Sequence, residues 1–213
     1  MTRHGLIFGL LLAVISAHSS FACQGSSVIL DESFKTPESG WDPPDDYTSY
    51  GPSGAVLKAP VSGGVTAFNK HFTSDGTDLC ATAVWPPSAI KAGKIDASAG
   101  ILFWAKDYTN YYTATVFSDG TVMIQRLIAN TWQTIVSPID LKEVVHLEPG
   151  GVNEVEVQIS GSKGILFING KKAANFVGQP PPGSGYVGLF GASVDTSAAV
   201  TLVFPKFQIA AYP

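Results

Sequence analysis

The clearest pattern in the chain is an alternation of apolar and polar residues over 154–159, where Val155, Val157 and Ile159 alternate with two glutamates and a glutamine. Successive side chains of a strand point to opposite faces, so this pattern predicts a strand with one face in the core and one in water. Sustained helical periodicity is absent from the sequence after residue 27. Further β-branched and aromatic runs predict strands within 28–34, 79–84, 100–105, 111–117, 121–127, 165–168, 186–190 and 200–209. The fold class is therefore all-β, with enough strands for two antiparallel sheets.

Turn residues indicate how some of these strands are connected. Asp119-Gly120 and Asn169-Gly170 tolerate positive φ and predict two tight hairpins. Residues 35–66 carry five prolines and predict a long ordered loop, in which Trp41 is a packing anchor. Pro205 lies inside the last predicted strand and indicates an edge position or a bulge there.

The N-terminus predicts export. Arg3 and His4 precede an apolar run over 5–15, which is followed by small and polar residues up to Ala22. This run is too short for a bilayer, so we expect a signal peptide at 1–22, a β-sandwich domain at 23–213 and no transmembrane segment in the mature chain. The expected location is periplasmic or secreted.

The two cysteines allow two interpretations. In an exported protein, Cys23 and Cys80 predict one disulfide. The alternative is a lipoprotein in which Cys23, the first residue after Ala22, is acylated and Cys80 is unpaired. Ser20 and Phe21 differ from the residues that usually precede such a cysteine, and this favours the disulfide.

Composition narrows the class of partner. Hydrophobic residues make up 45% of the chain and charged residues only 14%, which is typical of a folded core. Acidic side chains outnumber basic ones, 17 to 13, and Arg126 is the only arginine after the expected signal. Such a surface repels phosphate backbones, so nucleic acid is excluded as a partner.

The ordered set of these segments resembles the concanavalin A-like lectins and glucanases, including laminin-G-like and 3-keto-disaccharide hydrolase-type domains. The residues that carry the resemblance are 30–34 with Gly40-Trp41, 99–103 followed by Asn110-Tyr111-Tyr112, 150–157, 164–171 and 203–209. The resemblance implies a jelly-roll sandwich whose first and last strands lie together, and carbohydrate as the partner. That superfamily includes binding modules, enzymes and adhesion domains, so fold alone does not decide among them.

Catalytic and metal sites have only weak candidates. The Glu-x-Asp-x-x-Glu string of retaining glucanases is absent, and the nearest pair is Glu154 and Glu156, two residues apart on one strand face. His71 and His146 are isolated and accompany no hydrolase motif. Oxygen ligands for calcium could come from four aspartates, although turn formation explains the loop aspartates equally well. These are Asp31, Asp42, Asp45 and Asp46.

A carbohydrate site combines aromatic planes with amide and hydroxyl groups. The predicted ligand-binding residues are Trp104, Tyr111, Thr113, Thr115 and Gln125, which share one face if their strands are neighbours. Trp104 has the alternative of a place in the core. The leading hypothesis is an exported carbohydrate-binding module with no cofactor. The alternatives are a glycoside hydrolase acting on (3-keto-)disaccharides, and an envelope adhesion or scaffold domain with a protein partner.

Overall fold

The computed structural model describes residues 23–90, 96–195 and 197–213. The predicted signal peptide, 1–22, lies outside these residues. Within the described ranges, no helix is both long and apolar enough to cross a membrane.

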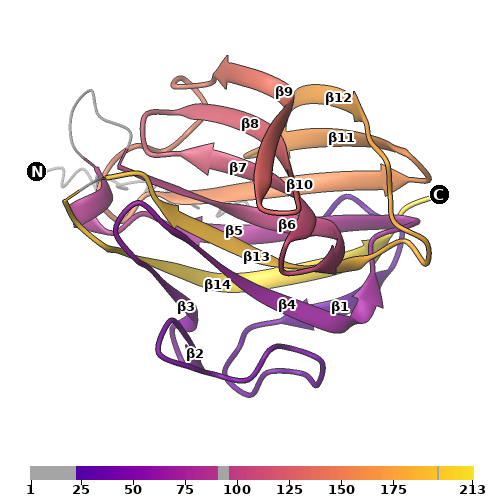
Figure 1. The fold of residues 1–213 in the computed structure, drawn as a ribbon, viewed down its shortest axis with the longest axis horizontal. Coiled ribbons are helices and arrows are strands. Elements are labelled where there is room, and N and C mark those ends of the chain that lie inside the picture. Colours follow the sequence, from indigo (N-terminus) through magenta and orange to yellow (C-terminus); the bar gives the residue numbers. More distant parts are fainter. Residues whose placement is uncertain (1–22, 91–95, 196) are drawn as a thin grey trace, which may run out of the picture.

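The described residues form two antiparallel sheets that lie face to face (Figure 1). The chain is all-β apart from one turn of 3-10 helix at Pro87–Ala89. The larger sheet has eight strands in the order β12 (Lys171–Val177), β11 (Lys163–Ile168), β10 (Val152–Ser160), β5 (Thr77–Val84), β14 (Val200–Ala211), β3 (Gly54–Ala59) and β2 (Thr48–Gly51), with β1 (Val28–Glu32) also paired to β14. The other has six strands in the order β4 (Gly64–Thr73), β13 (Tyr186–Ser193), β6 (Ala97–Asp107), β7 (Asn110–Phe117), β8 (Thr121–Ile128) and β9 (Thr131–Asp140).

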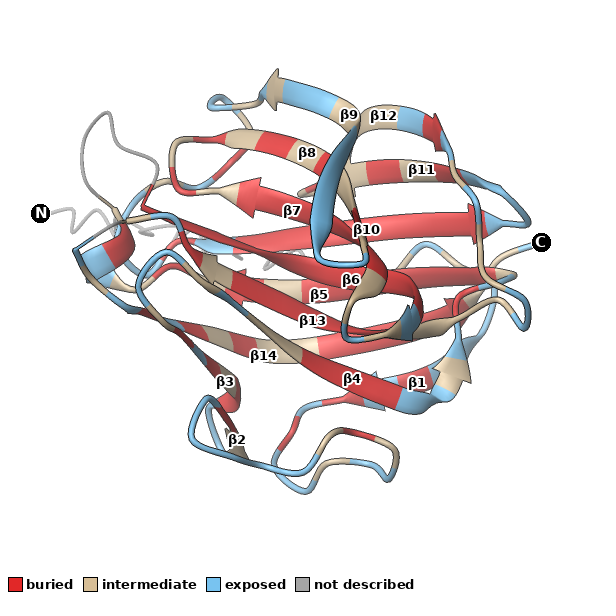
Figure 2. Cartoon of the chain, in the orientation of Figure 1, coloured by how far each residue is buried: buried red, intermediate tan, exposed pale blue. Residues whose placement is uncertain are grey.

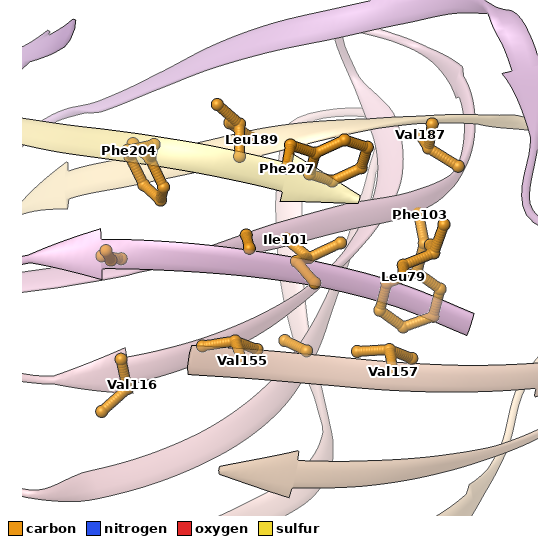
Figure 3. Packing of buried hydrophobic residues seen from close by; sticks show 14 of the residues in the cluster. Leu79, Ile101, Phe103, Val116, Val155, Val157, Val187, Leu189, Phe204 and Phe207 are labelled. Carbon is orange, nitrogen blue, oxygen red and sulfur yellow. The ribbon is translucent and has the colours of Figure 1, made fainter. Parts of the chain in front are cut away.

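The core lies between the sheets and follows the alternation seen in the sequence. Val155 and Val157 of β10 point inward and face Ile101 and Phe103 of β6, and all four are fully buried (Figure 3). Figure 2 shows the central strands almost wholly buried, while β9 and β12 at one side are largely exposed. Pairing of β1 with β14 places the first and last strands together, as the resemblance implies.

Both predicted hairpins are confirmed. Gly120 joins β7 to β8 with φ 86°, and Asn169-Gly170 joins β11 to β12 with φ 49° and 76°. Two consecutive positive φ values are those of a type I′ turn, which matches the right-handed twist of the flanking strands.

The prediction of one long loop over 35–66 is wrong in part, because this segment contains β2, β3 and the start of β4. Trp41 is the anchor that the sequence predicts. Its ring packs against Phe34, with ring centroids 5.0 Å apart, and against Phe207 at 5.4 Å. Pro52 and Pro60 directly follow β2 and β3, and the other three prolines precede β2, so none lies within a strand or prevents pairing.

Pro205 does not mark an edge strand. β14 is central and pairs with β1, β3 and β5. Its register with β5 shifts between Val203 and Lys206, so the proline occupies an irregularity in the ladder where a missing N–H is tolerated.

A disulfide joins Cys23 to Cys80 and confirms the predicted pair. The Cys23 amide also donates to Gln208 Oε1 at 3.0 Å, so the start of the described chain is fixed to the outer face of the eight-stranded sheet. Acylation of the Cys23 sulfur is incompatible with this bond, and the lipoprotein alternative is therefore wrong. Disulfides are typical of proteins that fold in an oxidising compartment.

Removal of the disulfide should lower stability markedly. The bond spans a sequence separation of 57 residues, and the chain entropy it removes from the unfolded state corresponds to about 4 kcal/mol. A Cys23→Ala/Cys80→Ala double variant should show this loss in urea unfolding monitored by tryptophan fluorescence. The reduced wild-type protein is the matched control and should unfold at the same urea midpoint as the double variant. A double variant that unfolds at the midpoint of the oxidised wild-type protein would contradict the prediction.

Candidate carbohydrate-binding groove

The outer face of the six-stranded sheet carries a second apolar cluster, separate from the core. Strand alternation places these residues on the face that points away from the other sheet. The buried members come from β4, β6, β7, β8 and β13: Phe68, Leu102, Ala105, Tyr111, Leu127 and Phe190. Because the opposite sheet does not cover this face, its aromatic side chains are available to form a surface site.

A groove of about 600 Å³ lies over this cluster. Trp132 of β9 is 42% exposed at the groove. Its ring meets Tyr111 edge-on with centroids 5.8 Å apart, and Phe190 at 5.9 Å. Edge-to-face contacts of this kind fix ring orientation, so Trp132 presents a held aromatic surface to solvent.

Polar groups surround the aromatic rings. Gln125, Asn130, Ser98 and Ser193 are among the lining residues, and the Ser193 hydroxyl donates to the Ala198 carbonyl at 2.7 Å. Burial raises the pKa of Tyr111 to about 12, so its phenol stays protonated at neutral pH. None of the described residues that line the groove carries a charge. This combination of rings, amides and hydroxyls can stack on an apolar ligand face and exchange hydrogen bonds with neutral polar groups.

The structure brings together part of the predicted site. Tyr111 and Gln125 line the groove, on the neighbouring strands β7 and β8. Thr113 and Thr115 lie on the same face of β7 as Tyr111 but are fully buried, and neither hydroxyl has a hydrogen-bond partner. Both side chains point to the outer face of the sheet, but neither is exposed and neither lines the groove.

The prediction that Trp104 shares one face with Tyr111 and Gln125 is wrong. Its φ is 48°, and the pairing of β6 with β7 shifts between Phe103 and Asp107. At this bulge two consecutive side chains point inward, so Trp104 is only 1% exposed and belongs to the core. Its ring packs against Tyr112 with centroids 5.0 Å apart. The core alternative is the one that the structure supports.

Trp132 is the main residue that the sequence interpretation missed. It lies on β9, an edge strand that was not predicted because 131–140 mixes polar residues with Pro138. The sequence does contain a turn signal, because Asn130 directly precedes β9. In the structure, Ala129 and Asn130 both have positive φ and form the turn from β8 into β9. Phe190 also lies in the groove, although its strand was predicted.

The alternation predicts that the polar face of β10 is exposed to water, but this face is buried. Glu154 and Glu156 are 4% and 1% exposed. Gln24, next to the disulfide, donates to Glu156 Oε2 at 3.0 Å, and Gln158 donates to its other oxygen at 2.9 Å. The N-terminal segment therefore covers part of this face, which lies on the sheet opposite the groove.

Burial, together with the negative charge of Asp78 on the neighbouring strand, raises the pKa of both glutamates to about 7. The pKa of Asp78 is also raised, mainly by burial. Such groups hold a proton near neutral pH, but a substrate has no open path to them. The two glutamates form a buried cluster rather than an accessible acid–base pair.

The four aspartates proposed for calcium do not converge. Asp31 pairs with Lys206 at 3.1 Å, and Asp42 pairs with Lys70 at 2.7 Å. Asp45 accepts backbone N–H groups in its own turn, and Asp46 is exposed. Among the described residues, the only group of three potential ligands that converges is Cys23, Asp78 and Cys80, whose sulfurs are joined in the disulfide.

Comparison with known proteins defines the fold. No family profile matches the sequence, and no curated protein resembles it in sequence. A galectin-like protein of unknown function from Bacillus subtilis superposes with a TM-score of 0.59 and 8% identity, covering 89% of this chain and 98% of that one. For a Bacillus licheniformis beta-glucanase the TM-score is 0.56 and the identity 8%, with coverages of 88% and 99%.

A third structure, the GH43 BlXynB protein from Bacillus licheniformis, has a TM-score of 0.59 and 14% identity over 85% of this chain and 39% of that one. The chain thus has the jelly-roll fold of the concanavalin A-like lectins and glucanases, as the resemblance implies. At these identities the comparison defines the fold alone.

The buried acids should make stability depend on pH. A carboxyl whose pKa rises from 4.5 to about 7 on folding binds more protons in the folded state, so stability falls as pH rises through that window. We expect the free energy of unfolding to decrease by about 3 kcal/mol for each such carboxyl between pH 4.5 and pH 7.5. Urea unfolding at a series of pH values measures it.

The variants Glu154→Gln and Glu156→Gln should flatten this slope, because an amide imitates the protonated acid. Glu143→Gln, at an exposed position, is the matched control and should leave the slope as in the wild type. A rise in stability over the same window would show that the acids are ionised in the folded protein.

Proposed function

We propose that this protein is an exported carbohydrate-binding β-sandwich, and that the groove on the six-stranded sheet binds a neutral glycan. The observation that carries the proposal is the exposed ring of Trp132, held by Tyr111 and Phe190 above a floor without charged groups. Sugar rings present apolar C–H faces to such rings, and their hydroxyls pair with amides such as that of Gln125. The disulfide supports the proposal of export.

Hydrolysis of (3-keto-)disaccharides has less support. Glycoside hydrolysis of the usual kind needs two carboxyl groups beside the scissile bond. The described lining of the groove offers none, and Glu154 and Glu156 are buried on the other sheet, where Gln24 of the N-terminal segment contacts Glu156. The geometry therefore favours binding over catalysis. The adhesion or scaffold alternative stays a prediction, which a protein partner in place of a glycan would support.

Trp132→Ala should abolish most of the affinity. Removing an aromatic hot-spot residue from a binding site costs about 2 kcal/mol or more, so we expect at least about a tenfold increase in Kd. A glycan array identifies a ligand, and isothermal titration calorimetry measures its Kd. Trp132→Phe, which keeps a ring, should retain part of the affinity.

Val177→Ala is the matched control, since Val177 is an exposed apolar residue on the edge strand β12 of the other sheet. It should bind as the wild type does. Unchanged binding by Trp132→Ala, or no glycan bound above background by the wild type, would refute the groove as a carbohydrate site.

Binding should be nearly independent of ionic strength. Salt screens contacts between charges, and none of the described groove residues is charged. Between about 0.05 and 0.5 M NaCl we expect Kd to change by less than about twofold. A loss of affinity of tenfold or more over this range would show that ionic contacts hold the ligand and would contradict a neutral glycan.

A further inference from the structure

A second hollow adjoins the groove. It encloses about 400 Å³ between the segment 42–48 and the beginning of β4, and Tyr47, Pro60 and Val65 are among its lining residues. Gly64 and Tyr108 line both this hollow and the groove. Because two lining residues are shared, the two hollows adjoin one another at β4, the edge strand of the six-stranded sheet.

Tyr108, at the junction, is exposed but firmly held. Its ring is 54% exposed and packs edge-on against Phe68, with centroids 4.6 Å apart. Its hydroxyl donates to Asp42 Oδ1 at 2.7 Å and accepts from Lys70 Nζ at 2.9 Å. Because both the ring and the hydroxyl of Tyr108 are held in place, the ring can contact a ligand at little entropic cost.

Tyr47, in the second hollow, is also 50% exposed. The Asp45 carboxylate fixes the backbone here by accepting the amides of Tyr47 and Thr48 at 2.8 and 2.6 Å. Two carboxylates line this hollow: Asp42 is paired with Lys70, and Asp45 is the acceptor of these two amides. The second hollow therefore offers the same kind of aromatic surface as the groove.

The junction itself is open because Gly64 has no side chain. A Cβ at this position would lie only 3.1 Å from the ring of Phe190. A larger residue would thus narrow the space between the two hollows, while glycine leaves it free.

Because the two hollows adjoin and share Tyr108, we infer that the ligand is a linear oligosaccharide chain that spans both hollows. Tyr108 and Tyr47 then form a second sugar subsite beyond Trp132. This inference rests on the proposed function, since it specifies the length of the glycan that the same face binds. Exposed aromatic residues near this face are explained together: Trp132, Tyr108 and Tyr47 mark successive positions along one path rather than three separate surface rings.

The test measures Kd by calorimetry for cello-, laminari-, malto- and manno-oligosaccharides, each from disaccharide to hexasaccharide. In the series that binds, affinity should rise with chain length in the wild type. Tyr47→Ala should weaken hexasaccharide binding by about tenfold and leave disaccharide binding unchanged, because Tyr47 lines the second hollow only. Tyr108→Ala removes a ring that lines both hollows and should also weaken hexasaccharide binding by about tenfold. Trp132→Ala should weaken binding of every length.

Tyr108→Phe is the matched control for the ring and should keep most of the gain with length. Tyr47→Ala guards against misfolding, because the contacts that fix this turn come from the Tyr47 backbone rather than its side chain. Disaccharides that bind as tightly as hexasaccharides, in a Trp132-dependent manner, would overturn the second subsite and leave the proposed function standing. Failure of every series to bind would overturn both.

Discussion

The alternation of side chains along each strand determines which side chains are buried in the core and which lie on the outer faces, where a ligand can bind. A sheet can bury only one of its faces against a partner sheet, so each of the two sheets has an outer face with a composition of its own. The inner faces supply a shared core of residues such as Ile101, Phe103, Val155 and Val157. The chemistry of the protein is therefore decided by the two faces that the core leaves over.

Those outer faces are opposite in character. The face of the six-stranded sheet is apolar and uncharged at its centre, and it carries an open groove with Trp132 at its side. The face of the eight-stranded sheet gathers Asp78, Glu154 and Glu156, which are buried in part under the segment that the disulfide fixes. Three acidic groups are thus enclosed on one side, while the groove on the other side is lined by uncharged residues.

The sequence predicts most of the fold because most strands are central and alternate strongly. It fails for β9 and β12, which lie at sheet edges, where exposure on both faces weakens the pattern. The predicted orientation of the Trp104 side chain is wrong for a different reason. A β-bulge in β6 interrupts the two-residue period of the strand, and the alternation of residue types does not reveal a bulge. The burial of Glu156 depends on Gln24, which is 132 residues away, and contacts at that separation leave no trace in a local pattern.

The placement of the chain ends has a consequence for how the groove meets large ligands. Residues near both ends of the described chain lie on the eight-stranded sheet, where Cys23 bonds to Gln208 and β1 pairs with β14. The groove opens from the other sheet, so the width of the sandwich separates the two. A solid surface or a fused tag attached at either end would sit behind the molecule and leave an extended polymer free to approach from the front.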